Sequence, residues 1–198
     1  MKNYVKYYNL ERYLFEDVHR RFHAEGSLGA FDFFSIIIWK ANRGKSMIAS
    51  KLLKTDKLRR RDLEAITRAI TRALYKAKTP KERLRVLSVD WRLPLPTASA
   101  ILTVGWPDEF TVFDYRVREQ INFQSLSYAS SFDNLWRVYL DYQARAAAAA
   151  PAALTLRDKD RYLWGKSAAL QLEEEIRRFF VKPTATRKKG GRRASLAV

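Results

Sequence analysis

Helix start and stop signals, with apolar residues at helical spacing between them, recur along most of this 198-residue chain. The segment after Asp62 places four aliphatic residues on one helix face: Leu63, Ile66, Ile70 and Leu74. The next segment opens with Thr79, Pro80 and Glu82, which together form a capping-box start. These signals predict an all-α, single-domain fold of eight to ten helices, with room for two lobes and a cleft between them.

The predicted helices span residues 10–25, 30–39, 45–54, 62–77, 80–89, 97–104, 114–123, 132–149 and 156–180. The run 30–39 is almost wholly apolar, so periodicity fits a buried strand as well as a helix. We predict a helix because no β-rich run nearby would pair with it. The alanine-rich tract 144–154, broken by Pro151, predicts a helix tail and a linker with little specific packing. We therefore assign the folded domain to residues 1–181.

Basic residues dominate the charge, with 38 Lys and Arg against 21 Asp and Glu, a formal net charge of +17 and a pI near 10.2. Residues 182–198 carry six basic and no acidic side chains and are expected to form a disordered tail. Without them the balance is still 17 − 6 = +11. Such an excess indicates a polyanionic partner, nucleic acid first and an anionic membrane second. We choose nucleic acid, with duplex DNA favoured.

The chain has no cysteine, which excludes disulfides and zinc–thiolate sites. Its start lacks a signal-peptide core, and no apolar run has the length of a membrane span. A cytoplasmic protein without membrane attachment, metal or other cofactor is the resulting expectation. The oligomeric state stays open.

The region 91–118 has the most distinctive organisation in the chain. A proline-bearing turn precedes a short helix of small and apolar residues that begins at Thr97. Gly105-Trp106-Pro107 ends that helix, because proline lacks an N–H and glycine ends helices readily. A brief extended run then delivers Asp114 to the start of another helix, which we expect to reach about Phe123.

This order of elements resembles the helix-hairpin-helix DNA glycosylases, the superfamily of endonuclease III. The separation from Thr97 to Asp114, 114 − 97 = 17 residues, is similar to the family's spacing. Residues 33–43 and 154–166 also look like an uncharacterised bacterial branch. The resemblance implies that the hairpin grips a DNA phosphate and that Asp114 is the catalytic carboxylate. The iron–sulfur cluster of several relatives is excluded by the lack of cysteine.

The chain departs from the family at the hairpin itself. Arg92 and Pro94 stand where the family has glycines, so backbone N–H groups approach a phosphate less well unless the Arg92 charge replaces them. Pro96 stands where bifunctional members carry a lyase lysine, so that position offers no Schiff-base nucleophile. The resemblance therefore supports only the monofunctional route, in which water attacks the sugar.

The candidate site residues combine one acid with a set of contacts to nucleic acid. Asp114 is the catalytic candidate, and its alternative role is an ordinary helix N-cap. A helix N-terminus and a nearby Arg116 would both favour the ionised carboxylate. The candidates for nucleic-acid contact are Arg92, Thr97, Arg116, Lys40, Arg43 and Lys45. For the last three, ordinary solvated surface is the competing interpretation.

Other notable residues have structural explanations. The tryptophans at 39, 136 and 164 and the Phe31–Phe34 group predict core packing, with one ring free to stack on an extruded base. The charged cluster 157–161 predicts a helix start with local ion pairs. His19 and His23 are four residues apart, but no third metal ligand accompanies them.

The resulting hypothesis is a DNA-binding protein that cleaves the N-glycosidic bond of a damaged base through an Asp114-assisted water. The degenerate hairpin leaves two alternatives: a non-catalytic DNA-binding module on the same scaffold, or an RNA-associated basic protein. The sequence does not name the lesion or the pathway.

Overall fold

The computed structural model describes residues 4–57, 62–124 and 131–180, and every regular element in these ranges is helical. The all-α prediction is therefore confirmed, as is the helical state of the apolar run after Gly29. The helices are α1 Leu10–Arg12, α2 His19–Glu25, α3 Ala30–Ala41, α4 Lys45–Thr55, α5 Leu63–Lys76, α6 Pro80–Arg85, α7 Leu95–Gly105, α8 Tyr115–Gln120, α9 Phe132–Ala149 and α10 Leu156–Phe180. The predicted tail, 182–198, lies outside the described residues.

Three of these helices belong to two longer helical runs. A wider, π-helical stretch at Tyr13–Val18 joins α1 to α2, so the first run covers Leu10 to Glu25 as predicted. Gly26 ends it in the left-handed conformation, at φ 64°. A second π-helical stretch, Val86–Asp90, continues α6 to the hairpin turn.

Caps set most helix ends where the sequence predicts them. Thr79 and Glu82 form the reciprocal capping box of α6, and Asp62 caps α5. Helix α3 extends to Ala41, two residues past the predicted end, and one end of α7 and one of α8 also differ by two or three residues. Helix α7 begins at Leu95 rather than Thr97, because the extended Pro94 precedes it and Pro96 suits its first turn. Helix α8 ends at Gln120, and Asn122 follows with φ 48°.

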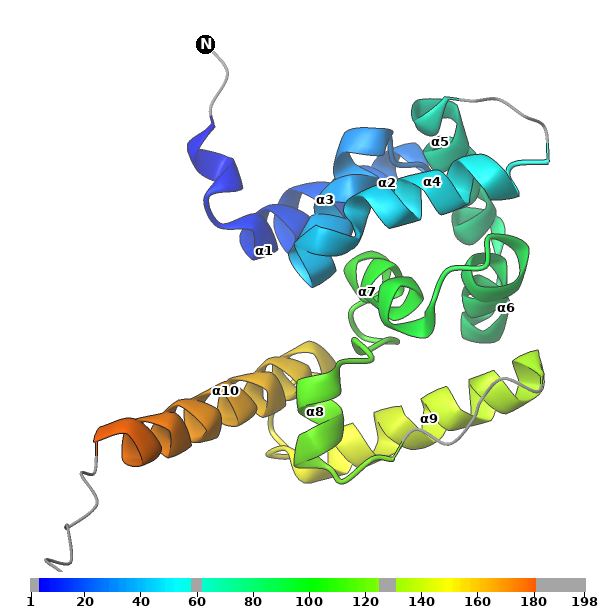
Figure 1. Cartoon of the computed structure of the whole chain (residues 1–198). Coiled ribbons are helices and arrows are strands. Elements are labelled where there is room, and N and C mark those ends of the chain that lie inside the picture. Colours follow the sequence, from blue (N-terminus) through cyan, green and yellow to red (C-terminus); the bar gives the residue numbers. More distant parts are fainter. Residues whose placement is uncertain (1–3, 58–61, 125–130, 181–198) are drawn as a thin grey trace, which may run out of the picture.

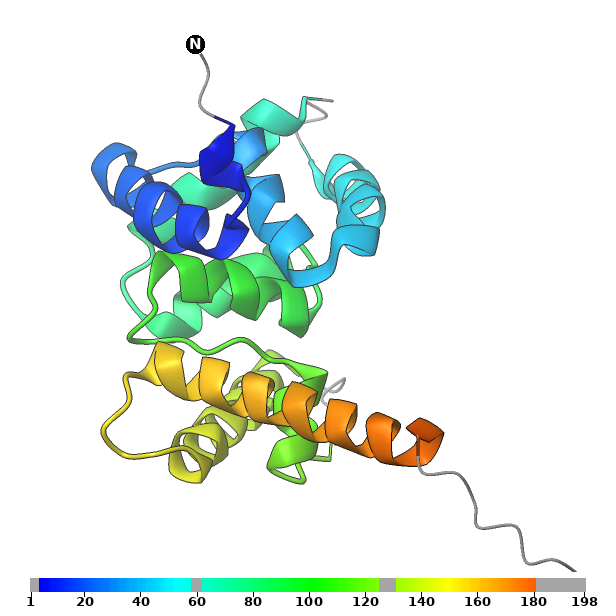
Figure 2. The ribbon, with the colours of Figure 1, turned by 90° about the vertical axis from the view of Figure 1, so that its left-hand side faces the viewer.

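The helices form two tiers (Figures 1 and 2). Helices α1 to α5 and α7 make the upper tier, and α8, α9 and α10 make the lower one. Apolar side chains fill the upper core, among them Leu14, Phe33, Ile36, Leu52, Ile66 and Ile70. The segment from Trp106 to Asp114 passes between the tiers, so it is the place where groups from both can meet.

Side chains, rather than a sheet, satisfy the backbone of this buried connecting segment. The Tyr139 hydroxyl donates to Thr111 O (2.9 Å) and accepts from Thr111 N (3.0 Å). Tyr142 bonds Val112 O (2.7 Å) and Asp114 N (3.3 Å) in the same way. Burial raises the pKa of both tyrosines, so their hydroxyls remain protonated donors.

Helix α7 holds the connecting segment from the other side. The hydroxyl of Ser99 accepts a hydrogen bond from Phe113 N at 2.8 Å. The C-terminal end of α7 is bound in turn by α2, where His19 Nδ1 lies 2.9 Å from Val104 O and His23 Nε2 lies 2.7 Å from Gly105 O. The histidine pair thus satisfies helix-end carbonyls, which explains its spacing without a metal.

The alanine tract packs more than its composition suggests. Residues 144–149 continue α9, and the chain leaves the helix before Pro151 as expected. Ala146 and Ala150 are buried, however, which corrects the expectation of little specific packing. Helix α10 packs against α9, the helix that the alanine tract continues.

We expect Tyr139→Phe to destabilise the fold by about 1–3 kcal/mol, since it leaves a buried N–H and a buried C=O of Thr111 without a partner. Thermal or urea unfolding measures this loss. Tyr162→Phe is the matched control, because Tyr162 is 43% exposed and should change stability by less than about 0.5 kcal/mol. Equal stability of the two variants would contradict the role given to Tyr139.

Candidate functional site

Asp114 sits where the connecting segment meets the lower tier. Its backbone is extended, and its side chain caps α8 by accepting from Arg116 N through Oδ1 at 2.9 Å. Its other oxygen, Oδ2, accepts from the ammonium of Lys40, which comes from the last turn of α3 in the upper tier. Asp114 is only 8% exposed. The carboxylate is therefore oriented by a helix start on one side and a lysine on the other.

A pocket of about 360 Å³ opens beside this pair. Its walls come from both tiers and from the connecting segment. The residues that line it are Glu11, Trp39, Lys40, Val112, Asp114, Arg157, Asp160, Arg161 and Trp164. Three acids face three bases, so the lining has no formal net charge although the chain is strongly basic.

A second ion-pair network forms another part of this lining. Arg157 on α10 contacts Asp160 one turn later and also reaches Glu11 Oε1 on α1 at 2.5 Å. Arg161 adds a contact to Glu11 at 3.3 Å. The Arg157 guanidinium lies 5.2 Å from the centre of the Trp39 ring. These pairs connect α10 to the upper tier across the pocket.

Asp160 is the most deeply buried acid of the pocket, at 4% exposure. Burial raises its pKa to about 6, and the negative charge of Asp114 acts in the same direction. The nearby Arg157 and Lys40 lower the pKa, but they offset only part of the burial effect. Asp160 therefore exchanges its proton close to neutral pH.

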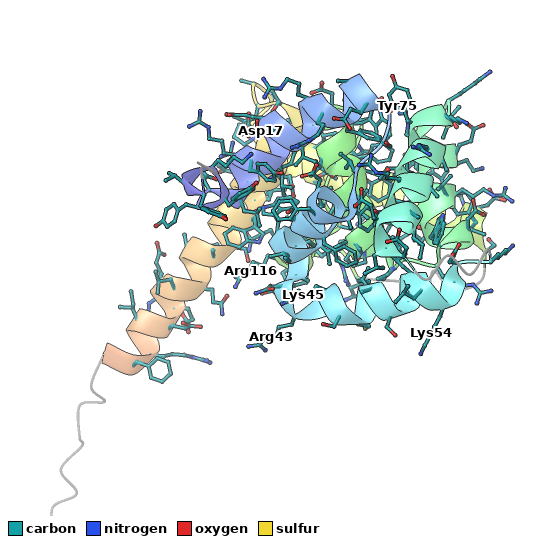
Figure 3. All side chains as sticks on the ribbon, turned by 90° about the horizontal axis from the view of Figure 1, so that it is seen from above. Asp17, Arg43, Lys45, Lys54, Tyr75 and Arg116 are labelled. Atoms are coloured by element: carbon teal, nitrogen blue, oxygen red, sulfur yellow. The ribbon has the colours of Figure 1, made fainter. Side chains whose placement is uncertain are left out.

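The structure separates the six predicted contact residues into different environments. Lys40 alone of the six lines the pocket, where it pairs with Asp114. Arg116 lies in the first turn of α8. It donates to Gln171 Oε1 at 2.6 Å, and its guanidinium lies 5.4 Å from the centre of the Trp164 ring. Arg43 and Lys45 are exposed. Figure 3 shows both, with Lys54, along the outer edge formed by α4.

The hairpin keeps a tight turn despite its lack of glycine. Arg92 is exposed and adopts φ 52°, the left-handed conformation that glycine adopts at no steric cost. Leu93 N closes the turn on Leu87 O at 2.8 Å. Lys51 of α4 donates to Arg92 O at 3.2 Å, which brings the basic edge of α4 to the hairpin.

Helix α7 offers few free backbone donors at its start. Pro94 and Pro96 have no N–H, and Thr97 N is bonded to Pro94 O at 2.9 Å. Thr97 itself is half-buried. Any phosphate held at this turn would depend mainly on side-chain charge.

The contribution of α10 to the pocket does not follow from the sequence pattern. The charged cluster 157–161 predicts helix-start ion pairs, and those pairs do exist. Arg157, Asp160 and Trp164, at i, i+3 and i+7, also share one helix face, and that face meets the pocket. The core prediction is also wrong for Trp164 and Phe31, which are 48% and 60% exposed. The spacing alone could have grouped the three α10 residues, but not placed them opposite Asp114.

Comparison with known protein families, with curated proteins and with solved structures found no match to this chain. Within the described ranges, no helix has both the length and the apolarity needed to cross a membrane.

We expect Asp160 to make the protein less stable as pH rises from about 4 to 6. Its pKa is higher in the folded state than in the unfolded chain, so the folded state binds more protons in this window and loses stability as they leave. Asp160→Asn should remove this dependence of stability on pH. The free energy of unfolding of wild type relative to the variant should fall by up to roughly 3 kcal/mol across the window.

Urea unfolding of both proteins at a series of pH values measures this difference. Asp158→Asn provides the comparison, because Asp158 is on the same helix but its pKa is lowered by the Thr155 hydroxyl. A difference between wild type and Asp160→Asn that does not change with pH would contradict the assignment.

Proposed function

We propose that this protein hydrolyses the N-glycosidic bond of a damaged base in DNA, with Asp114 as the carboxylate that assists the attacking water. The observation that carries the proposal is the position of Asp114, which the resemblance marks as catalytic, at a pocket whose lining includes two indole rings. The carboxylate is held there from two sides, by Lys40 and by the start of α8.

The contacts of Asp114 leave it capable of this chemistry. Each carboxylate oxygen has two acceptor positions, and the structure uses one on Oδ1 for Arg116 N and one on Oδ2 for Lys40. A water can therefore still bind the carboxylate. Negative charge at this point would stabilise the cationic sugar that develops as the base leaves.

The pocket suits an extruded base. Its volume lies within the usual range for small-ligand sites, and Trp39 and Trp164 supply aromatic surfaces for stacking. The charged groups of the lining offer both hydrogen-bond donors and acceptors. Because the lining is neutral overall, we assign attraction of the DNA backbone to residues outside the pocket.

The basic edge along α4 and the hairpin supplies that attraction in this proposal. Lys51 and Arg92 meet at the turn, and the exposed Arg43, Lys45 and Lys54 continue the edge (Figure 3). Lysine and arginine side chains bind phosphates without reading sequence, and this binding weakens as salt rises. Side-chain charge would thus replace the backbone donors that the two prolines remove.

The pairing of Lys40 favours the water-dependent route. An amine attacks a sugar carbon only when its nitrogen is neutral and free. Here the Lys40 nitrogen donates to the Asp114 carboxylate, so we assign it the role of holding and balancing that charge.

We expect Asp114→Asn to lower base release by about 10²-fold or more, since the amide is neutral and cannot accept the proton from water. Asparagine caps helices as well as aspartate does, so the variant should remain folded. Release of base from duplex oligonucleotides carrying a panel of damaged bases measures the effect, with Asp108→Asn, an exposed acid of the connecting segment, as control. Full activity of Asp114→Asn would remove Asp114 from the mechanism.

We expect Arg92→Gly to separate DNA binding from stability. Glycine relieves the left-handed strain at φ 52°, so stability should rise by about 0.5–1 kcal/mol. DNA affinity should fall for all sequences, and the slope of log affinity against log salt should decrease by about 1.

Fluorescence anisotropy over a salt series, together with thermal unfolding, checks both parts. Arg20→Ala is the matched control, because this exposed arginine pairs with Asp17, which lies on the far side of the molecule from Lys54 in Figure 3. An equal loss of affinity in the two variants would argue against a hairpin contact.

A non-catalytic DNA-binding module is the second candidate. It is favoured by the pocket itself, in which Asp114 and Asp160 both already contact a basic side chain of the protein. Salt-sensitive DNA binding without release of any base from the panel would select this alternative.

A further inference from the structure

The pocket contains a second acid whose surroundings differ from those of Asp114. Asp160 lies on the face of α10 that lines the pocket, and the side chain of Arg157 is its hydrogen-bond partner among the described residues. Asp114 lies on another wall of the pocket, fixed by a backbone N–H and by Lys40. Two carboxyl groups in one pocket with different environments can take opposite roles in proton transfer.

We infer that Asp160 is the proton donor of this pocket: its carboxyl group protonates the departing base while Asp114 accepts a proton from the attacking water. The inference rests on the proposed glycosidic hydrolysis and adds to it a second catalytic residue, one that the sequence had suggested only as part of an ion-pair cluster.

The charges around Asp160 support this division. From its own helix Arg157 contacts it, and Lys40 and Asp114 act on it from α3 and from the connecting segment. The buried tyrosines Tyr139 and Tyr142 of α9 feel its charge, but their neutral hydroxyls donate to Thr111 O and Val112 O. Burial outweighs the two bases, and the resulting pKa of about 6 suits a group that gives up a proton near neutral pH.

The proposed step balances in atoms and charge. The bond between C1′ and the base nitrogen breaks, and its electron pair goes to the base, which takes the Asp160 proton. Water forms the new bond to C1′ and gives its proton to Asp114. The site ends with Asp160 ionised and Asp114 protonated, and exchange with solvent restores the starting state. Inverting glycosidases divide acid and base roles between two carboxyl groups in the same way.

This role predicts a dependence on the leaving group that a structural role would not produce. Uracil and hypoxanthine leave as anions unless they are protonated, so an acid that protonates them speeds their release. N7-methylguanine is already cationic in DNA and leaves as a neutral base. Loss of the Asp160 proton should therefore slow release of the first two and spare the third.

The test compares wild type, Asp160→Asn and Asp114→Asn on duplexes that carry uracil, hypoxanthine or N7-methylguanine. We expect Asp160→Asn to lower release of uracil and hypoxanthine by about 10²-fold or more and to leave N7-methylguanine within a fewfold of wild type. Asp114→Asn should lower all three. For uracil and hypoxanthine, wild-type kcat/KM should fall as pH rises above about 6, and Asp160→Asn should lose this limb.

Asp158→Asn is the control on the same helix, since Asp158 caps the start of α10 with Thr155 and does not line the pocket. Asp160→Glu restores a carboxyl group and should recover part of the release of uracil and hypoxanthine. If Asp160→Asn does not fold, Asp160→Glu decides: the same three-base comparison should show a shifted pH limb for uracil and hypoxanthine alone.

The outcomes separate this inference from the proposed function. Equal losses on all three bases, an unchanged pH limb, or wild-type release confined to N7-methylguanine would overturn the role of Asp160 and leave the glycosylase proposal intact. If wild type released no base at all while still binding DNA, both would fall together.

Discussion

Two tyrosine hydroxyls and one serine hydroxyl hold the strand-like segment on which the rest of this structure depends. Tyr139, Tyr142 and Ser99 replace the backbone partners that a sheet would have given residues 111–114. Without them a buried segment between two helical tiers would leave its amides and carbonyls unsatisfied, at a cost of several kcal/mol. The same contacts fix where the chain turns into α8. They therefore also fix the position of Asp114.

The candidate site follows from that arrangement. Lys40 belongs to the upper tier, Asp160 to the lower tier and Asp114 to the segment between them. Ion pairs that cross the pocket, from Lys40 to Asp114 and from Arg157 to Glu11, both orient these groups and join the tiers. The charge that would attract a polyanion lies elsewhere, along α4 and the hairpin. The molecule thus separates a neutral pocket from a basic edge.

Much of the helical scaffold could be predicted because its signals are local. Capping residues act within one turn: Thr79 forms the predicted capping box with Glu82, and Asp62 caps α5 in the same local way. The N-cap role of Asp114 is also a local signal, and the structure shows this cap at the start of α8. The role of Trp164 was not predictable in this way, because whether an aromatic residue lies in the core or at a pocket depends on which helix packs beside it.

The sequence by itself determined the all-α class, the helix limits to within a few residues and the basic character, since these depend on neighbouring residues and on composition. Only the tertiary structure decided that Lys40 faces Asp114 and that α10 brings Asp160 to the same pocket. These residues are 74 and 46 positions from Asp114 (114 − 40 and 160 − 114), and no short-range pattern encodes such distances. They meet because burial of the apolar helix faces brings the tiers together around the connecting segment.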